Sequence, residues 1–256
     1  MPYTTINEIR VFYRKSKKTN NVKKTIIFIH GSGGDGFVWE QQLNGLSDFI
    51  TVIIPDLPGH GKSEGLCFGS AKDYAGWLND FAECLKISSF YIAGHSLGGA
   101  IVQEFAASYP EKTEGLILVG TGLFFDISKE YMELLQTDFK AAINISCENA
   151  YAGKVSEELY KKGYQMLLEN GKNTLYKDML SSESFDGSEL FLSNNPCLIL
   201  CGQEDRITNP ALSRELSKKI NKSTFHVVPK AGHLVMIEAA DETNRAIESF
   251  VISERV

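Results

Sequence analysis

A glycine-flanked serine forms the part of the chain best suited to covalent chemistry. Residues 94–98 read Gly-His-Ser-Leu-Gly and lie between the apolar run FYIA and the apolar helical segment LGGAIVQEFAAS. On a sharp turn between a strand and a helix, the serine hydroxyl is exposed above the sheet, and the turn needs small neighbours. The helix N-terminus also favours negative charge that develops at the hydroxyl. The pattern predicts that Ser96 is a nucleophile, the alternative being a serine that only forms a tight turn.

A serine hydroxyl is a weak nucleophile unless a base accepts its proton. The five histidines stand at positions 30, 60, 95, 226 and 233. His95 is next to the serine but should point elsewhere on such a turn, and His226 lies within a strand. His233 occupies a glycine-containing loop between the last strand and the last helix. Loops that follow parallel strands gather at one edge of the sheet, so His233 is the predicted base.

The base needs an acid that holds its tautomer and stabilises the imidazolium. Glu204 and Asp205 lie in the loop after the penultimate apolar run. Their spacing does not separate the two carboxylates, and either could be an ordinary solvated loop residue. The order serine, acid, histidine along the chain is nevertheless the one found with a G-x-S-x-G turn on such a sheet.

The elements that must position these residues follow a regular alternation. After two edge segments, YTTI and IRVFYRK, apolar runs of strand length alternate with helical patterns. The runs span residues 25–30, 50–55, 90–94, 115–120, 197–202 and 224–229. Continuous apolar strands that alternate with helices are typical of a mostly parallel sheet with helices on both faces. The sequence therefore predicts the α/β class.

The alternation stops between residues 123 and 190, which contain helical patches and no convincing strand. Because this stretch lies between two strands of the sheet, we expect a helical cap over the strand ends. The predicted organisation is a core formed by 1–122 and 191–256, with a cap at 123–190. A chain of 256 residues can bury such a core in one domain.

Taken together, these segments resemble the α/β-hydrolase fold superfamily, in particular its capped, cofactor-free serine hydrolases. The resemblance extends through FIHGSGG, VIIPDLPGHGKSEG, IAGHSLGGAIVQEFAASYPE, LILVGTG, CGQEDRI and AGHLVMIEAADETNRAIESFV. It implies that the acid follows the glycine of the penultimate strand by three residues, which selects Asp205 after Gly202. Two prolines depart from the pattern, since one is shifted to Pro210 and the other is replaced by Ala240. The related dehalogenases and epoxide hydrolases have an aspartate where this chain has Ser96.

The loop HGSGGDG, residues 30–36, has two interpretations. The resemblance implies an oxyanion hole built from the backbone N–H groups of Ser32 and Leu97. The glycines at 31, 33 and 36 also match the G-x-G-x-x-G spacing of a dinucleotide site, with Asp56 placed to bind a ribose. We find no residues suited to hydride transfer, so we expect the oxyanion loop, a structural Asp56 and no cofactor.

The amino-acid composition limits the classes of partner that the protein could bind. The net charge of −6 argues against binding to nucleic acid and gives no support for docking on anionic membranes. No window of the sequence is apolar enough to span a bilayer. The five cysteines are scattered without a C-x-x-C pair, so we expect neither disulfides nor a metal site. The start of the chain lacks a secretory pattern, and a cytoplasmic location fits these features best. The sequence does not indicate the oligomeric state.

The expected reaction is hydrolysis of a small or medium-chain carboxylic ester through an acyl-enzyme on Ser96. Residues 123–190 are rich in aromatic and methionine side chains, some of which should line an apolar acyl pocket. Seven lysines and twelve acids give this stretch a charge of −5, which disfavours polyanionic substrates unless the charges only form a solvated outer face. The alternatives are a C–C bond hydrolase or lyase of the same fold, and a triad-bearing receptor for a small ligand with little turnover.

Overall fold

The structure is a computed structural model that describes residues 2–16, 24–190, 192 and 195–253. Eight strands form one sheet in the order β1-β2-β4-β3-β5-β6-β7-β8. The chain begins with an antiparallel pair, β1 (Tyr3–Ile6) and β2 (Ile9–Lys15), and β2 also pairs antiparallel with β4. The other strands pair in parallel; they are β3 (Lys24–Ile29), β4 (Ile50–Pro55), β5 (Phe90–His95), β6 (Thr113–Val119), β7 (Cys197–Gly202) and β8 (Ser223–Val228).

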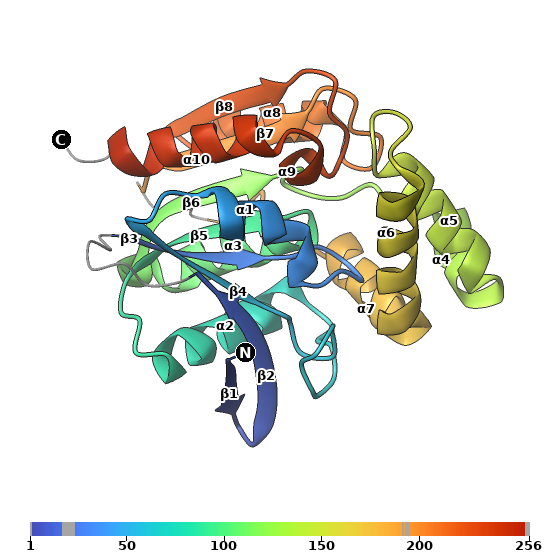
Figure 1. Cartoon of the computed structure of the whole chain (residues 1–256), viewed down its shortest axis with the longest axis horizontal. Helices are drawn as coiled ribbons and strands as arrows, with labels where there is room; N and C mark the ends of the chain where they lie inside the picture. Colours follow the sequence, from blue (N-terminus) through green and yellow to red (C-terminus); the bar gives the residue numbers. More distant parts are fainter. Residues whose placement is uncertain (1, 17–23, 191, 193–194, 254–256) are drawn as a thin grey trace.

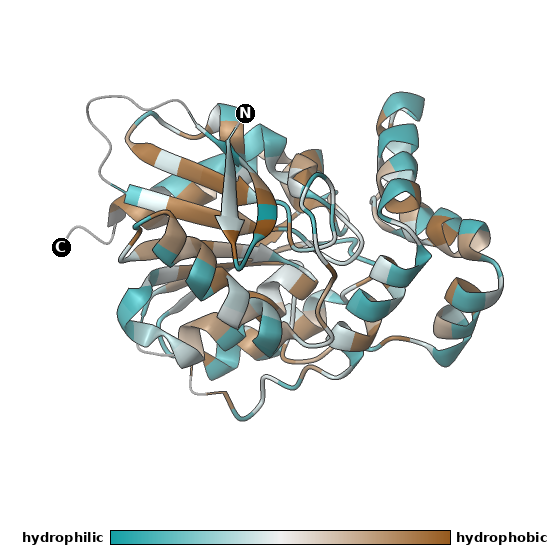
Figure 2. Ribbon diagram, turned by 90° about the horizontal axis from the view of Figure 1, so that it is seen from below, coloured by the Kyte–Doolittle hydropathy of each residue, from teal (hydrophilic) through white to brown (hydrophobic). Residues whose placement is uncertain are grey.

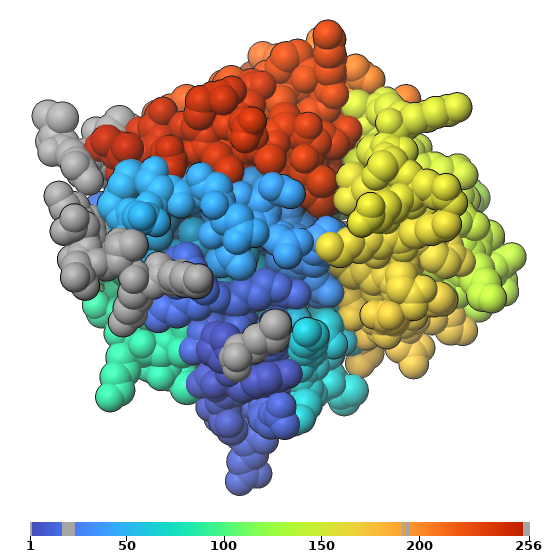
Figure 3. Space-filling model, in the orientation of Figure 1, coloured from blue at the N-terminus to red at the C-terminus, as the bar shows by residue number. Residues whose placement is uncertain are grey.

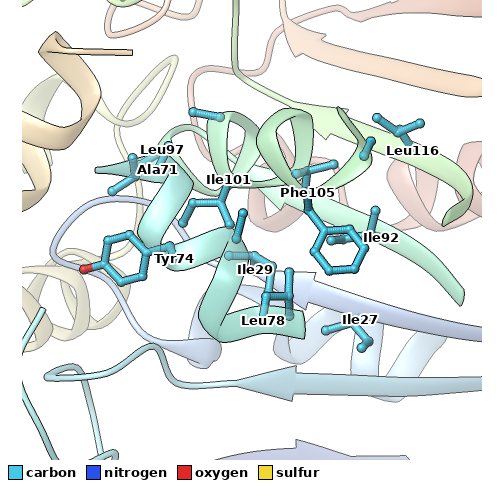
Figure 4. Close-up of a cluster of buried hydrophobic side chains, with 14 of the residues drawn as sticks. Ile27, Ile29, Ala71, Tyr74, Leu78, Ile92, Leu97, Ile101, Phe105 and Leu116 are labelled. Carbon is cyan, nitrogen blue, oxygen red and sulfur yellow. The ribbon is translucent and has the colours of Figure 1, made fainter. Parts of the chain in front are cut away.

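Both faces of the sheet are buried, because successive side chains of a strand point to opposite faces. In β3, Ile27 and Ile29 join one hydrophobic cluster, whereas Ile26 and Phe28 join the other. Figure 4 shows part of the first cluster, in which strand residues such as Ile92 lie with side chains from two helices. The central strands are largely brown, that is hydrophobic, in Figure 2, with some white and teal segments. This two-sided burial explains the continuous apolar runs of the sequence.

Three helices contribute to the first cluster: α2 (Ala71–Cys84), α3 (Leu97–Ser108) and α8 (Pro210–Lys219). The second cluster is covered by the 3₁₀ helix η1 (Gly36–Trp39), α1 (Glu40–Gly45), α9 (Val235–Glu238) and α10 (Ala240–Ser253). A short 3₁₀ helix, η2 (Pro110–Lys112), leads into β6. The predicted mostly parallel sheet with helices on both faces is confirmed.

In the described part of the stretch between β6 and β7 there are four helices, and we refer to them as the inserted helices. They are α4 (Lys129–Thr137), α5 (Phe139–Asn149), α6 (Glu157–Asn170) and α7 (Lys172–Glu183). They have a hydrophobic cluster of their own, which includes Leu135, Ile143 and Leu167. Figures 1 and 3 show them together at one end of the molecule, on the right of both views.

The predicted division into a core and a cap has a boundary that lies outside the described residues. The sequence predicts that the chain returns to the core at residue 191, which is not among the described residues. Residue 1 and residues 254–256, at the ends of the predicted core, also lie outside them. Within the described part of the chain, no helix combines the length and the apolar character that crossing a bilayer would require.

Candidate active site

Ser96 occupies a strained turn between β5 and α3. Its backbone has φ 54° and ψ −122°, a conformation that residues with a side chain seldom adopt. Its N–H donates to the carbonyl of Val119 at 3.0 Å. A Cβ atom on Gly94 would lie 2.1 Å from the carbonyl oxygen of Gly98, and one on Gly98 would lie 2.5 Å from that of Ile29. The two glycines flanking the serine are therefore needed for the close approach of the backbone.

The structure brings together His233, in the loop after β8, and Asp205, in the loop after β7. The Nδ1–H group of the His233 ring donates to Oδ2 of Asp205 at 2.9 Å, and both side chains are buried. The other carboxylate oxygen accepts hydrogen bonds from the N–H groups of Ile207 and Thr208. Glu204, the alternative acid, is exposed to solvent. The geometry therefore pairs Asp205, and not Glu204, with the predicted base.

His95 has a contact with the predicted base that the sequence did not suggest. Its ring lies 4.4 Å from the ring of His233, and its Nε2–H donates to the backbone carbonyl of His233 at 3.0 Å. Burial and the neighbouring His233 hold the pKa of His95 well below its ordinary value, so the ring is neutral at pH 7. His95 thus helps to fix the loop that carries His233. His226, by contrast, binds Glu242 at 2.8 Å on the outermost parallel strand.

The predicted oxyanion loop lies directly against the serine turn. A Cβ atom on Gly31 would lie 3.0 Å from Cβ of Ser96, so the two backbones approach closely. The N–H of Gly34 donates to the carbonyl of Gly31 and closes a tight turn around Ser32. Within the described part of the chain, the N–H groups of Ser32 and Leu97 donate to no protein acceptor. Ser32 lines both pockets at Ser96 that are described below, whereas Leu97 is fully buried, and the role of both as oxyanion donors stays a prediction.

The glycine spacing of this loop serves contacts within the protein. The Asp56 carboxylate accepts hydrogen bonds from the Arg14 guanidinium at 2.6 Å and from the N–H groups of Gly36 and Lys62. A Cβ atom on Gly36 would lie 2.4 Å from the Arg14 guanidinium, and one on Gly33 would lie 2.7 Å from a Leu175 methyl group. This packing favours the structural role of Asp56 over a ribose-binding one.

Two residues that support the site escaped the sequence analysis. Gly120, directly after β6, has φ +55°, and a Cβ atom there would lie 3.2 Å from Nδ1 of His233. Glu238 accepts hydrogen bonds from the N–H groups of Gly232 and Ala152 at 2.8 and 2.9 Å. Glu238 therefore ties the His233 loop to the segment between α5 and α6, and burial raises the pKa of its carboxyl group.

Two pockets meet at Ser96, and we name them the apolar pocket and the outer pocket. Both include Ser32, Ser96 and Met179. The apolar pocket is also lined by Val38, Ala150, Tyr151, Met166, Leu167, Leu175, Leu234 and His233, among others. The outer pocket adds Phe125, Asp126, Ser128, Tyr131, Asn149, Ser182 and Arg206. No Asp, Glu, Lys or Arg lines the described walls of the apolar pocket, whereas Asp126 and Arg206 line the outer pocket.

The aromatic and methionine residues expected in the cap divide between these pockets and the packing of the inserted helices. Tyr151, Met166 and Met179 line the apolar pocket, whereas Phe125 and Tyr131 line the outer pocket. Three others pack against the hydrophobic cluster of the inserted helices: Met132, Phe139 and Tyr164. Phe124 is exposed. Among the described residues, no group of three or more His, Cys, Asp or Glu side chains is arranged to hold a metal ion.

The sheet, the strained serine turn and the loops that meet at it define a hydrolase of the α/β-hydrolase fold. Comparison with known families agrees, since residues 26–246 match the alpha/beta hydrolase family. Because this match spans most of the chain, the protein belongs to that family.

Individual relatives have different names. A curated protein from Paraburkholderia phymatum, named 2-hydroxy-6-oxononadienedioate/2-hydroxy-6-oxononatrienedioate hydrolase, is 28% identical, with 95% of this chain and 91% of the relative covered. The solved structure of a thermophilic esterase is also 28% identical, with a TM-score of 0.88 over 98% of this chain and 97% of that one. An enol-lactonase from Burkholderia xenovorans LB400 has the same TM-score at 21% identity, covers 98% of this chain and 100% of its own, and shows the fold alone.

Proposed function

We propose that this protein is a serine hydrolase that cleaves small or medium-chain carboxylic esters with an apolar acyl group. The observation that carries the proposal is the apolar pocket, which reaches Ser96 and has no charged side chain on its described walls. Acyl chains gain free energy when they leave water for such a surface. The inserted helices supply much of that wall, and in this proposal they act as the cap over the site.

The proposed reaction uses the geometry in two steps. Ser96 Oγ attacks the acyl carbon while Nε2 of His233 takes the hydroxyl proton, and the N–H groups of Ser32 and Leu97 hold the oxyanion. Asp205 keeps the Nδ1–H tautomer, which leaves Nε2 free to accept. His233 then donates the proton to the leaving alcohol. A water molecule then attacks the acyl carbon while the same nitrogen takes its proton. The nitrogen returns this proton to Oγ of Ser96, the acyl–oxygen bond breaks and the carboxylic acid leaves.

A second candidate reaction is cleavage of a carbon–carbon bond. The name of the Paraburkholderia phymatum relative describes a hydroxy-oxo dicarboxylate without an ester group, so its hydrolysis must break such a bond. A substrate of this kind has two carboxylates. The apolar pocket has no cation on its described walls, and Arg206 in the outer pocket is exposed. Among the described residues that line the two pockets, one cation would therefore face two carboxylates, so a substrate with a neutral acyl group fits better, and this favours ester hydrolysis.

The test is a set of initial rates on p-nitrophenyl esters from acetate to decanoate, measured beside the rate on 2-hydroxy-6-oxononadienedioate. We expect ester turnover with a clear optimum of acyl length, and a loss of several orders of magnitude in the folded Ser96→Ala variant. Faster cleavage of the dicarboxylate would establish the carbon–carbon reaction. Tight binding of an ester with negligible turnover would instead indicate a receptor. The expected cytoplasmic location belongs to the same proposal, and fractionation of cells that produce the protein tests it.

A further inference from the structure

Asp178 on α7 is a fully buried acid that connects the inserted helices to the core. Its carboxylate accepts three hydrogen bonds from three other segments. Oδ2 accepts from the N–H of Gly33 at 2.7 Å and from Nε2 of His60 at 2.8 Å, and Oδ1 accepts from the Tyr74 hydroxyl at 2.9 Å. Figure 4 shows this hydroxyl pointing away from the labelled aliphatic side chains. A charge buried this deeply is tolerated only with such partners.

Gly33 belongs to the turn that presents the predicted oxyanion donor. The Gly34 N–H to Gly31 carbonyl bond closes this turn, with Ser32 and Gly33 at its two central positions. Gly33 has φ +63° and Ser32 has a negative φ, which is the pattern of a type II turn. Type I and type II turns differ in the orientation of the central peptide, here the one between Ser32 and Gly33. By holding the N–H of that peptide, Asp178 keeps the turn in the type II form.

A second contact joins α7 to the same turn. The Ser182 hydroxyl lies 3.3 Å from the Ser32 hydroxyl, and it also donates to the backbone carbonyl of Asp178 at 3.0 Å. Ser32 is thus held on its C-terminal side by Asp178 and at its side chain by Ser182. The orientation of its own N–H, which points to the developing oxyanion in the proposed reaction, depends on both contacts.

The hydrogen bonds of His60 require a doubly protonated ring. Nε2 faces the Asp178 carboxylate, and Nδ1 lies 3.0 Å from the carbonyl oxygen of Pro58. Both partners only accept, so each ring nitrogen must donate a proton. Burial by itself would lower the pKa of His60, but the Asp178 charge and hydrogen bond, the Pro58 carbonyl and Asp56 together hold that pKa above its ordinary value.

Other titratable groups around His60 leave this assignment intact. The His30 ring lies 5.0 Å away, and burial together with the His60 charge lowers its pKa to about 4, so it is neutral. Burial and the Asp178 charge raise the pKa of the Tyr74 hydroxyl and of the Cys67 thiol, so neither ionises near neutral pH. Burial and Asp56 raise the pKa of Asp35, whose side chain also pairs with Arg14.

We propose that the buried pair of Asp178 and protonated His60 is a positioning device, by which the inserted helix α7 holds the oxyanion turn in its working form. The inference rests on the proposed function, because it assumes that the Ser32 N–H stabilises an oxyanion. Asp178 and His60 do not line either pocket at Ser96, so they act through the turn and not on the substrate.

The device predicts a specific response to alkaline pH. His60 keeps both protons below its raised pKa and loses one as the pH rises through it. The buried carboxylate then faces a nitrogen lone pair, which is unfavourable, and its hold on Gly33 weakens. The value of kcat should therefore fall on the alkaline side, while KM changes little because the oxyanion contact forms mainly in the transition state.

The variants separate positioning from stability. Asp178→Asn removes the charge, and Tyr74→Phe is the matched control, because it removes one hydrogen bond to the same carboxylate and leaves the contact with Gly33. We expect Asp178→Asn to lower kcat by about tenfold to a hundredfold at unchanged KM, less than the ~10²–10³-fold that follows loss of an entire oxyanion donor. Tyr74→Phe should lower thermal stability and change kcat by less than about twofold.

The His60→Gln variant and nuclear magnetic resonance give readouts that stability alone would not move. A glutamine amide can donate to Asp178 but does not titrate, so the alkaline fall of kcat should disappear in His60→Gln. The ¹⁵N shifts of the His60 ring in the wild-type protein should show both nitrogens protonated at pH 7. This measurement needs neither turnover nor a folded variant.

The outcomes distinguish this inference from the proposed function. A wild-type protein that turns over no ester overturns both. An active wild type whose Asp178→Asn variant matches Tyr74→Phe in kcat overturns the positioning role alone. The same conclusion follows if His60 has an unprotonated ring nitrogen at pH 7. It also follows if the kcat of His60→Gln falls at alkaline pH as the kcat of the wild type does.

Discussion

Nδ1 of His233 lies 2.9 Å from Oδ2 of Asp205, and the opposite oxygen of that carboxylate is held by two backbone N–H groups two and three residues further along the chain. The carboxylate is therefore fixed on both sides, and its orientation does not depend on solvent. The arrangement explains why the acid of this loop is the residue at 205. The carboxylate one position earlier, that of Glu204, is exposed to solvent.

This relationship predicts different effects for the two neighbouring acids. Asp205→Asn keeps the size of the side chain but favours the wrong histidine tautomer, so we expect kcat to fall by about 10⁴-fold. Glu204→Gln is the matched control and should change kcat by less than about twofold. Rates on the best p-nitrophenyl ester, with circular dichroism to verify folding, provide the measurement. Equal losses in the two variants would contradict the assignment of Asp205.

The strained backbone at Ser96 should lower the free energy of unfolding of the protein. Ser96→Gly and Ser96→Ala both remove the nucleophile, but only glycine adopts φ 54° and ψ −122° without strain. We expect the glycine variant to have a free energy of unfolding about 1 kcal/mol above that of the alanine variant. Urea unfolding of the two variants measures this difference. An alanine variant as stable as the glycine variant would show that the turn stores no strain.

Much of the fold and part of the site followed from local patterns. A strand buried on both faces must be apolar at successive positions, so the parallel strands were visible as continuous runs, as in residues 26–29. The serine turn was visible because its glycines are close in sequence. Because loops after parallel strands share one edge of the sheet, the position of His233 near the serine turn could be predicted.

Contacts between residues that are far apart in the sequence could not be predicted from local patterns. Asp178 is one of twelve acids in the stretch 123–190, whose charges could have formed a solvated outer face, yet it is fully buried. Its partners Gly33, His60 and Tyr74 lie more than a hundred residues earlier in the chain. Nothing local distinguishes Asp178 from its exposed neighbours, because its environment exists only after the inserted helices pack on the core.

Gly120 is another residue that only the tertiary structure identifies, and it predicts a steric effect on the base. In Gly120→Ala, the new methyl group would lie 3.2 Å from Nδ1 of His233 and 3.4 Å from Oδ2 of Asp205, at φ +55°. We expect kcat to fall by about tenfold or more, since small displacements of reacting groups cost that much. The backbone strain should also lower the free energy of unfolding by about 1–2 kcal/mol.

Gly171→Ala is the control for this effect. Gly171 also has a positive φ, of +85°, but a methyl group there would meet no atom within 4 Å. The control should therefore lose stability and keep its kcat. Thermal unfolding and steady-state rates, measured on both variants, separate the two effects. If both variants keep the wild-type kcat, the space beside His233 is not limiting.

The buried ring of His30 predicts how the free energy of unfolding changes at acidic pH. Burial, followed by the charge of His60, lowers the pKa of His30 from 6.5 to about 4 in the folded protein. Between these values the unfolded chain binds a proton that the folded protein does not, so the free energy of unfolding must fall as the pH drops. The contribution of this residue should reach about 2–3 kcal/mol near pH 4.

The His30→Gln variant tests this contribution. Its amide can donate to the Gly31 carbonyl and accept from the Leu57 N–H, as the ring of His30 does, but it does not titrate. We expect this variant to be less stable at pH 7 and to lose less stability than the wild type between pH 6.5 and 4 in urea titrations. His226→Gln, at a half-exposed site on β8, should retain the wild-type loss. If the acid loss in His30→Gln equals that of the wild type, the neutral buried ring is not its source, and protonation of other buried groups such as His95 must account for it.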